Sequence, residues 1–498
     1  LKGQKRGAKI VVLDPRRNQI GRWADLHVPF RSGTDVALIN GLMNVIISEG
    51  LADERYIAER TEGFEELKAT VAEYTPERVA GITEVPAETI REVARLYAKN
   101  RPSAILYAMG ITQHTTGVDN VKSTANLAML CGNMGVAGGG VNPLRGQNNV
   151  QGACDMGGLP NVYPGYQVVT SEDVQKKFRE AWGSTAPLKV GLTITEMLGL
   201  AEQKEIRALY VMAENPMLSD PDINHVRQCL EATEFLVVQD IFLTETAELA
   251  HVVLPGVTFA EKDGTFTNTE RRVQRVRKAI EPLGEARQDW EIVCRIARKM
   301  GAAGFDFESP EEIMEEISRL TPSYGGITYE RLEKLGSLQW PCPNAEHPGT
   351  PYLHKDKFAR GLGKFFALEY KEPAEMPDAE YPFILTTGRV MFHFHTGSMT
   401  RRSPKLESEA PQAYVEINPA DAREIGLDGR RRVRVASRRG EIEVEARITD
   451  EIKRGLVFIP FHFAEAAANT LTNSAIDPVA KIPEYKVCAV KLVPAEQK

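Results

Sequence analysis

A Gly-rich stretch from 138 to 166 carries the residue types best suited to chemistry. It reads GGGVNPLRGQNNVQGACDMGGLPNVYPGY and holds eight glycines and three prolines, so no helix or strand pattern is visible in it. A loop of this length inside a compact protein is usually functional or disordered, and its low charge and recurring Val, Leu and Tyr argue against disorder. Its amide side chains both donate and accept hydrogen bonds, which suits a heteroatom-rich ligand. These amides are Gln147, Asn148, Asn149 and Gln151.

Arg145 is the only cation in this stretch. A guanidinium group among amides fits a bidentate grip on a planar carboxylate. The alternative is a Gly-rich surface loop with a solvated arginine. Composition alone leaves both interpretations open.

Short apolar runs with polar residues at their ends lie on both sides of this stretch. Strands are expected at 9–13, 103–109, 206–212, 235–238 and 251–254. Continuous apolar runs are typical of parallel strands buried on both faces, and ligands bind outside the carboxyl ends of such strands. The pattern predicts an α/β protein with two Rossmann-like domains and nucleotide-like cradles. The residues expected to line the cradles are Asp14, Arg16, Gly33, Asp35, Gly110, Gln113, Glu214, Asn215, Gln239, Asp240 and Thr244.

Helical patterns are expected at 34–49, 52–60, 63–73, 87–99, 118–131, 287–300 and 310–320. Thr34 is a plausible N-cap, and Gly33 before it leaves the helix N-terminus open to a phosphate. Neither G-x-G-x-x-G after a strand nor G-x-x-x-x-G-K-[ST] is present, so NAD and ATP have no support. His114 could be a metal ligand, but a lone histidine is more often structural, and we place it near the site at most.

The pattern changes in the last third of the chain. The segment 261–279 reads as a hairpin followed by a basic, exposed segment from Arg275 to Lys278, and the region 322–375 reads as irregular. From about 377, short alternating or apolar strands predict a β-rich domain. His393 and His395 could form a metal pair, but no third ligand lies at a usual spacing, so no metal ligand is predicted.

Composition narrows the class of protein. The chain has 498 residues, 42% of them hydrophobic, which predicts several domains with substantial cores. The net charge of −7 without a long like-charge run argues against nucleic acid, and no apolar run approaches membrane-spanning length. The six cysteines form no C-x-x-C pair, and isolated thiols fit a reducing, cytoplasmic setting. The first residue is Leu1 and the chain opens in mid-unit, so we expect an N-terminal part to be missing.

The sequence RGQNNVQGACDMG (residues 145–157) resembles the signature of molybdenum- or tungsten-dependent formate dehydrogenases. The resemblance runs over the whole chain in order. These enzymes belong to the dimethyl sulfoxide reductase family. The resemblance implies oxidation of formate to CO2, or the reverse, at a Mo or W bis-molybdopterin guanine dinucleotide. Electrons would leave through a 4Fe-4S cluster to a partner subunit of iron–sulfur, flavin or hydrogenase type. Arg145 would orient formate, and the cluster and metal ligands would lie upstream.

The resemblance also implies an architecture. Two Rossmann-like domains would surround a pterin cleft, and a six-stranded double-psi β-barrel would follow. The expected domains are 1–147, 148–285, 286–376 as a linking region, and 377–498 as the barrel. FTNTERR, near 270, is a weaker match that points to Asn268, Glu270 and Arg271. The remaining residues expected to contact the pterin are Gly146, Gln147, Asn148, Arg389, His393, His395, Thr396, Ser398, Asn469, Asn473, Tyr485 and Lys486.

Two alternatives stay open. A nitrate or other oxyanion reductase would use the same scaffold, although the RGQNNVQGACDMG stretch argues against it. A non-catalytic scaffold, like the large subunit of respiratory NADH dehydrogenases, would keep the domains without a pterin. Arg145 and the polar strand ends argue against that alternative.

Overall fold

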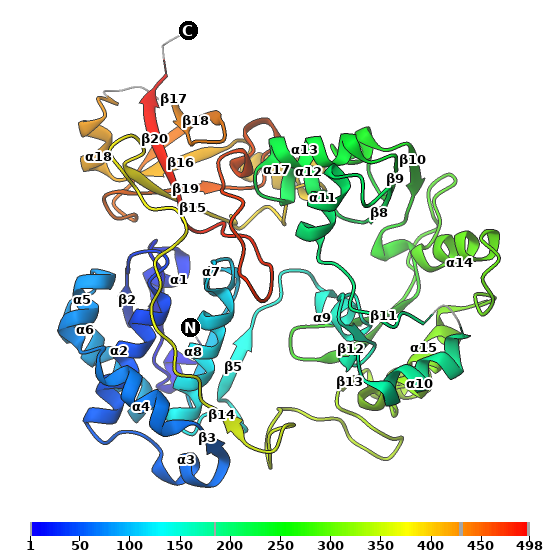
Figure 1. Cartoon of the computed structure of the whole chain (residues 1–498), viewed down its shortest axis with the longest axis horizontal. Helices are drawn as coiled ribbons and strands as arrows, with labels where there is room; N and C mark the ends of the chain where they lie inside the picture. Colours follow the sequence, from blue (N-terminus) through cyan, green and yellow to red (C-terminus); the bar gives the residue numbers. More distant parts are fainter. Residues whose placement is uncertain (1, 184–185, 428–431, 496–498) are drawn as a thin grey trace. The chain divides into compact units, whose positions relative to one another are not determined.

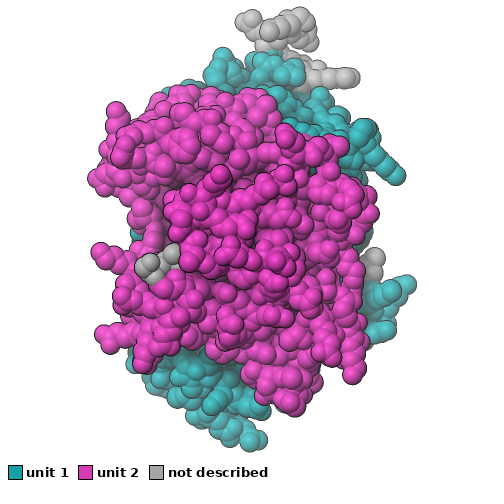
Figure 2. All heavy atoms as spheres, turned by 90° about the vertical axis from the view of Figure 1, so that its right-hand side faces the viewer, with its two compact units in different colours: residues 1–143, 218–225, 352–498 teal, residues 144–217, 226–351 magenta. Residues whose placement is uncertain are grey.

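The computed structural model describes residues 2–183, 186–427 and 432–495. The chain forms two compact units, which are coloured separately in Figure 2. Unit 1 comprises residues 1–143, 218–225 and 352–498, and unit 2 comprises residues 144–217 and 226–351. Each unit is therefore assembled from segments that are far apart in the sequence. The finer division into four domains remains a prediction.

The first part of unit 1 is built around helix α2 (Asp35–Ser48), whose Leu42, Met43 and Ile46 are fully buried. Two pairs of parallel strands belong to this part, β1 (Val11–Leu13) with β2 (Leu26–Val28) and β4 (Ala104–Tyr107) with β5 (Gly140–Pro143). Helix α2 contacts α4, α5, α6 and α8, drawn in blue and cyan in Figure 1. The other helices here are α1 (Gln19–Trp23), α3 (Glu54–Arg60), α4 (Phe64–Ala72), α5 (Pro76–Thr83), α6 (Ala87–Lys99), α7 (Met109–Thr112) and α8 (Gly117–Leu130).

The helices predicted in this part are confirmed, with ends that agree within two residues. Thr34 precedes α2, but its hydroxyl donates to the Arg31 carbonyl oxygen at 2.6 Å and does not cap the helix. The hydrophobic pattern does not reveal α5. Its signal is local instead, because Thr75 Oγ1 accepts from the Arg78 N–H at 3.3 Å and Pro76 occupies the first helical position.

The C-terminal part of unit 1 is a closed six-stranded barrel with the order β15-β19-β16-β18-β17-β20. Pairs β15–β19 and β16–β18 are parallel, whereas β17 pairs antiparallel with both of its neighbours. Alternate residues such as Val433 and Val435 are fully buried inside the barrel, as period-two patterning requires. The predicted six-stranded barrel is therefore confirmed. Its strands are β15 (Phe383–Gly388), β16 (Tyr414–Ile417), β17 (Arg432–Ala436), β18 (Glu441–Ile448), β19 (Leu456–Pro460) and β20 (Cys488–Pro494).

Arg16 joins the two parts of unit 1. Its Nη2 donates to Glu416 Oε1 of β16 at 2.7 Å, and its Nε donates to Glu416 Oε2. Its guanidinium lies over the ring of Phe458 of β19, 4.0 Å from the centroid. The Glu416 side chain is 6% exposed, so solvent screens this bidentate pair weakly.

Unit 2 contains a parallel sheet with the order β10-β9-β8, formed by β8 (Ala208–Met212), β9 (Phe235–Asp240) and β10 (Val252–Pro255). These strands confirm the predicted positions. The expected burial on both faces is wrong, because Tyr210 and Met212 of β8 are 45% and 48% exposed. A short apolar run cannot distinguish a strand covered on both faces from one covered on a single face.

Two regions predicted to be irregular contain regular elements. The stretch 138–166 holds β5, α9 (Val150–Asp155) and β6 (Val162–Tyr163), while 322–375 holds α16 (Tyr329–Leu335), β13 (Ser337–Gln339) and β14 (Gly363–Lys364). The elements are too short for a hydrophobic period to mark them. The hairpin predicted near 265 is confirmed as β11 (Gly264–Thr267) and β12 (Arg272–Val276). Arg275 is not exposed as expected, because its guanidinium packs 3.6 Å from the ring centroid of Tyr329.

The remaining elements complete the two units. The helices predicted near 290 and 315 are confirmed as α14 (Asp289–Lys299) and α15 (Pro310–Leu320). In the part of the chain that the structure describes, no helix combines the length and apolar character needed to cross a membrane. The other elements are β3 (Thr61–Glu62), β7 (Gln167–Val168), α10 (Glu172–Trp182), α11 (Ile194–Glu202), α12 (Pro216–Ser219), α13 (Ile223–Ala232), α17 (Pro404–Glu409), α18 (Pro419–Glu424), and the 3-10 turns η1 (Gln4–Arg6), η3 (Ala247–Leu249), η4 (Phe259–Glu261), η5 (Pro322–Tyr324), η6 (Thr400–Arg402), η7 (Ala464–Ala466) and η8 (Ala468–Thr470).

We expect Glu416→Ala to lower the free energy of unfolding by about 1–3 kcal/mol, because it leaves the Arg16 guanidinium half-buried without its carboxylate. Urea denaturation measures the change. Glu443→Ala is the matched control, since it breaks the exposed pair between Arg432 and Glu443 in the same barrel and should cost under about 1 kcal/mol. Equal losses for both variants would contradict the special role of Arg16.

Candidate functional site

Polar residues follow β1 and β4 of unit 1, as predicted. Asp14 begins the turn after β1, where its carboxylate accepts from the Arg16 N–H at 2.9 Å and from Asn18 Nδ2 at 3.0 Å. Gly33 precedes α2 with a φ of 81°, and a Cβ there would lie 2.4 Å from Pro373 Cγ. A side chain at this buried position would be strained and would collide with Pro373, so the close packing at the start of α2 requires glycine. Gly110 is exposed and Gln113 is half-buried after β4.

Asp35 and His114 form a buried pair whose members lack full hydrogen bonding. The atoms Asp35 Oδ2 and His114 Nε2 lie 3.9 Å apart. His114 Nε2 donates to the Gly110 carbonyl oxygen at 2.9 Å, which leaves Nδ1 as an acceptor. Within the residues that the structure describes, Asp35 Oδ2 and His114 Nδ1 are buried without a partner. Burial raises the pKa of Asp35 to about 7 and lowers the pKa of His114 to about 4.

Lys486 is also buried, and its ammonium donates to the Thr387 carbonyl oxygen at 2.7 Å. Burial lowers the pKa of Lys486 to about 8, while nearby Asp14 opposes that shift. The neighbouring candidates bind backbone: Tyr485 Oη donates to the Ser219 carbonyl oxygen at 2.9 Å, and Asn473 Nδ2 to that of Val487 at 3.0 Å. Asn469 Nδ2 donates to the Leu218 carbonyl oxygen at 2.8 Å, and its Oδ1 is buried without a partner among the described residues.

The loop after β15 supplies a further polar group. Arg389 Nε is buried without a partner in the described part of the chain, and burial lowers the pKa of this guanidinium. His393 uses both ring nitrogens, with Nε2 donating to the Ala410 carbonyl oxygen at 2.7 Å and Nδ1 3.2 Å from Thr400 Oγ1. Both ring nitrogens are thus occupied by the protein. Burial lowers the pKa of His395 to about 4. Thr396 Oγ1 and Ser398 Oγ lie 3.1 Å apart.

His462 is a polar residue of this loop region that the sequence patterns miss. Its Nε2 accepts from the Val390 N–H at 2.9 Å, and its Nδ1 donates to the His395 carbonyl oxygen. Burial lowers its pKa to about 4, which keeps the ring neutral in this arrangement. His462 lies two residues after the end of β19, and this position near a strand end was the signal that could have identified it.

The strand ends of unit 2 carry the predicted polar residues, bonded within the protein. Asn215 Oδ1 accepts from the Thr246 hydroxyl at 2.7 Å, and Gln239 Nε2 donates to Asp289 Oδ1 at 2.7 Å. Asp240 Oδ1 accepts from the Phe242 N–H at 3.1 Å. The other predicted positions here are Glu214, half-buried, and Thr244, buried.

Arg145 of unit 2 is exposed, and hydrogen bonds hold its backbone N–H and its side-chain Nε. Its backbone N–H donates to Thr269 Oγ1 at 3.2 Å, and its Nε donates to Gln151 Oε1 at 3.1 Å. Among the described residues, no acceptor is bound to its Nη1 or Nη2. Gly146 and Asn148 next to it are exposed and Gln147 is half-buried, so the polar surface around the guanidinium is open.

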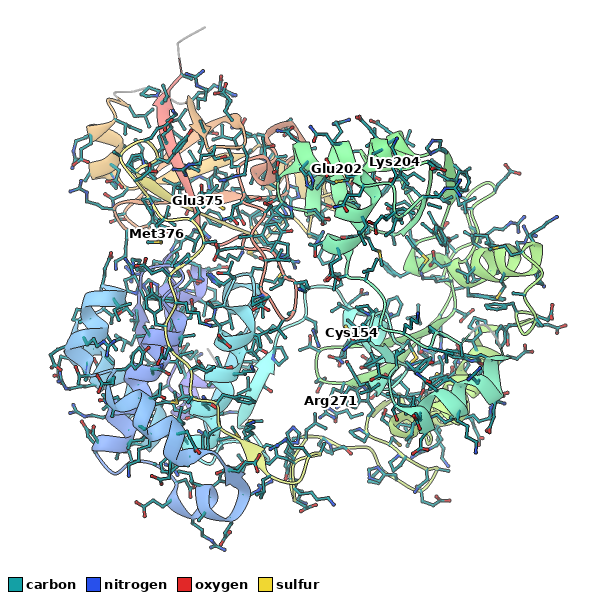
Figure 3. The ribbon with its side chains drawn as sticks, in the orientation of Figure 1. Cys154, Glu202, Lys204, Arg271, Glu375 and Met376 are labelled. Carbon is teal, nitrogen blue, oxygen red and sulfur yellow. The ribbon has the colours of Figure 1, made fainter. Side chains whose placement is uncertain are left out.

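The weaker candidates shape the hairpin turn next to Arg145. Asn268 Oδ1 accepts from the N–H groups of Glu270 and Arg272, both at 3.0 Å. Arg271, labelled in Figure 3, has a φ of 64° and donates through Nη2 to the Pro351 carbonyl oxygen at 3.1 Å. Cys154, also labelled there, is half-buried on α9, and burial raises the pKa of its thiol.

These arrangements suit a large polar ligand with both donors and acceptors. Several buried side-chain atoms of unit 1 have no partner among the described residues, and four of them belong to residues near the strand ends and loops discussed above: acceptors at Asp35, His114 and Asn469, and a donor at Arg389. A buried polar group left unpaired costs free energy, so these atoms are candidates for contact with a ligand. A nucleotide-bearing organic cofactor fits this donor and acceptor set.

The Asp35 carboxyl gives a pH test. Its folded pKa of about 7 lies above the ordinary 3.8, so the folded state holds a proton that the unfolded state releases between these values. Its effect therefore destabilises the fold increasingly as pH rises from about 4 to 7, and is constant above. We expect Asp35→Asn to raise the melting temperature of the cofactor-free protein by a margin that grows over this window. Thermal unfolding at several pH values measures it.

Asp25→Asn is the control with the opposite sign. Hydrogen bonds from the Ile10 N–H and from Gln4 and Lys9 lower the pKa of Asp25 to about 2. The ionised Asp25 carboxylate stabilises the fold above pH 3.8, and this stabilisation is lost as pH falls through 2. Asp25→Asn should therefore be less stable than the parent at neutral pH. A pH-independent difference for Asp35→Asn would refute the assignment.

Comparison with known proteins agrees with this geometry. Residues 1–299 match the molybdopterin oxidoreductase family, and residues 383–489 match the molybdopterin dinucleotide binding domain. The F420-dependent formate dehydrogenase 1 subunit alpha of Methanococcus maripaludis is 53% identical over 495 residues, which are 99% of this chain and 73% of that protein. The assimilatory nitrate reductase catalytic subunit of Bacillus subtilis is 37% identical over 507 residues, covering 99% and 71%.

Among solved structures, acetylene hydratase from Pelobacter acetylenicus has the same fold, with a TM-score of 0.76 and 22% identity over 99% of this chain and 75% of that one. The family match spans more than half of the chain and includes the strand-end residues of both units. The match to the dinucleotide binding domain spans the barrel strands from β15 to the start of β20. The chain belongs to the molybdopterin oxidoreductase family.

Proposed function

We propose that this chain is the catalytic part of a formate dehydrogenase, which oxidises formate to CO2 or runs the reverse reaction. The observation that carries the proposal is Arg145, a guanidinium that is anchored through its Nε and open at Nη1 and Nη2 among the described residues. The 53% identity to a formate dehydrogenase alpha subunit supports the same substrate. The nitrate reductase relative, at 37%, is more distant.

Formate is small and offers a protein few handles besides its two oxygens. A bidentate guanidinium satisfies both oxygens and fixes the direction of the C–H bond. Positioning is a large share of catalysis when the reactant is this small. Arg145 would therefore bind and orient formate, while Gln113 and Gln147 would adjust contacts to the pterin or the substrate.

A molybdenum or tungsten bis-molybdopterin guanine dinucleotide would supply the two-electron redox chemistry when bound. The buried unpaired atoms of Asp35, His114, Arg389 and Asn469 support contacts of unit 1 to it. We propose that a 4Fe-4S cluster carries electrons onward to a partner subunit of iron–sulfur, flavin or hydrogenase type. The F420-dependent relative suggests F420 as the electron acceptor.

A cytoplasmic location is proposed from the isolated thiols. The other cofactor contacts proposed are Asp14, Arg16, Gly33, Gly110, Gly146, Asn148, Glu214, Asn215, Gln239, Asp240, Thr244, His393, His395, Thr396, Ser398, Asn473, Tyr485 and Lys486.

We expect Arg145→Lys in the complete enzyme to lower kcat/KM for formate by about 100-fold or more, because lysine keeps the charge and loses the fork. Metal and pterin content should stay near the parent level, since other residues hold the cofactor. Steady-state kinetics and metal analysis of one preparation test this. A parent-like kcat/KM indicates a solvated arginine, and loss of pterin indicates a phosphate clamp; either result rejects substrate binding.

Asp240→Ala in the complete enzyme should lower pterin content more than it changes the KM for formate, because the Asp240 carboxylate would bind a guanine or ribose edge. Pterin release and fluorescence quantify the effect. Asp263→Ala is the control. The Asp263 carboxylate belongs to the same unit, is exposed, and makes one long ion pair, at 3.5 Å, with Arg275 of the hairpin. Normal pterin content with a selective rise in KM would move Asp240 to the substrate side.

A further inference from the structure

Behind Arg145 lies a chain of hydrogen bonds, all within unit 2, whose central residues Gln151, Asp155 and Tyr324 are buried while Tyr166 is 40% exposed. Gln151 Oε1 accepts from Arg145 Nε at 3.1 Å, and Gln151 Nε2 donates to Asp155 Oδ1 at 2.8 Å and to Tyr166 Oη at 2.9 Å. Asp155 Oδ2 accepts from Tyr324 Oη at 2.5 Å. Gln151 and Asp155 are 6% and 1% exposed. We propose that Gln151 and Asp155 are positioning residues that set the orientation of the Arg145 guanidinium, and hence of formate; this rests on the proposed function of Arg145.

Asp155 determines which way the Gln151 amide points. The two ends of an amide are told apart only by their partners. A carboxylate accepts and never donates, so the end of Gln151 next to Asp155 must be the NH2 group. The oxygen then faces Arg145 and can accept from Nε. With the reverse orientation, two donors would meet at Arg145 and the guanidinium would lose its anchor.

Two tyrosines keep Asp155 in its acceptor role. Tyr166 Oη lies 3.0 Å from Asp155 Oδ1 and Tyr324 Oη binds the other oxygen. Burial, and next the charge of Asp155, raise the pKa of both phenols, so both remain protonated donors. Tyr324 Oη is 3.1 Å from Thr267 Oγ1, which belongs to β11. Asp155 therefore connects α9 to the hairpin that also holds the Arg145 backbone.

The anchor selects one edge of the guanidinium for the substrate. A guanidinium offers a carboxylate either its Nε–Nη edge or its Nη1–Nη2 edge. Gln151 occupies Nε, and the backbone of Arg145 is held by Thr269. Formate therefore meets the Nη1–Nη2 edge end-on, and the direction of its C–H bond depends on the amide of Gln151.

A purely structural role for Gln151 would be to join α9 to its neighbours. Both roles predict some loss of stability when the amide is removed. Only the positioning role predicts that the kinetic loss depends on Arg145. The experiment therefore uses a double-mutant cycle in the complete, cofactor-loaded enzyme.

Gln151→Met removes the acceptor and keeps the side-chain length. We expect kcat/KM for formate to fall by about 10- to 100-fold with parent-like metal and pterin content, as for loss of a hydrogen bond to a charged group. The inhibition constant of acetate, a carboxylate that cannot be oxidised, should rise by a comparable factor. In the Arg145→Lys background the same change should lower kcat/KM less than about 3-fold, because lysine has no Nε–H to anchor.

Gln175→Met is the matched control. This glutamine of the same unit donates to the carbonyl oxygens of Val169 and Leu188 at 2.8 and 3.1 Å and makes no contact with the chain behind Arg145. It should leave kcat/KM and the acetate constant within about 2-fold of the parent. An equal effect of both methionine variants would overturn the proposal.

Gln151→Glu keeps an acceptor for Arg145 and places two carboxyls at the 2.8 Å separation now spanned by the amide. Such a pair must share a proton. We expect kcat/KM of this variant to approach the parent at low pH and to fall along a new limb as pH rises and the shared proton is lost. A structural role would give a pH-independent loss.

The outcomes distinguish a failure of the proposed function of Arg145 from a failure of the positioning role of Gln151. Parent-like kinetics of Arg145→Lys would reject the proposed function itself. A strong defect in Arg145→Lys together with a parent-like Gln151→Met, or with a full additional loss in the double variant, would reject positioning alone. Loss of metal and pterin in both Gln151 variants would assign the residue to structure and would also overturn the proposal.

Discussion

A buried polar group must find a partner, and two groups of candidate site residues meet this constraint in different ways. In unit 1, Asp35 and His114 are buried with atoms that no described residue satisfies. In unit 2, Gln151 and Asp155 are equally buried, and each of their donors and acceptors has a partner. Unsatisfied atoms favour a ligand that completes them, whereas a satisfied network fixes geometry. The proposed cofactor binding and the proposed substrate orientation thus follow from the same physical rule.

The satisfied network explains how an exposed arginine can act with defined geometry. An arginine side chain has many rotamers, and its freedom on a surface would scatter the orientation of a small substrate. Arg145 avoids this because its Nε and its backbone N–H are both held. The Nη1–Nη2 edge that remains can match two carboxylate oxygens. In the proposed function, the protein would supply this orientation, and the cofactor would supply the redox chemistry.

The sequence predicts the features that repeat, and it misses those that depend on distant residues. The barrel and helix α2 carry regular hydrophobic periods, so both were predictable. Helix α9 has six residues, VQGACD, which are too few for a hydrophobic period to mark it. Gln151 could be named as a ligand-type amide, but its contacts with Asp155 and, through it, with Tyr324 could not. That last link joins residues 169 apart in the chain, a separation that local patterns do not report.

The exposure of β8 was unpredictable for a related reason, since an apolar run shows what a strand can bury and not what covers it. His462 escaped notice because its role depends on the Val390 N–H and the His395 carbonyl oxygen of another segment. Site residues identified from strand ends are placed by topology, which the sequence conveys. Their hydrogen bonds are set by packing, which it does not convey.

Formate is the substrate that we propose for this chain. The most direct measurement is a dye-linked assay of the complete enzyme. Formate is offered with an oxidised dye, and nitrate is offered with a reduced dye. The metal content is determined on the same preparation. We expect the enzyme to reduce the dye with formate and to show no turnover with nitrate. Nitrate reduction without formate oxidation by metal-loaded enzyme would contradict the proposal.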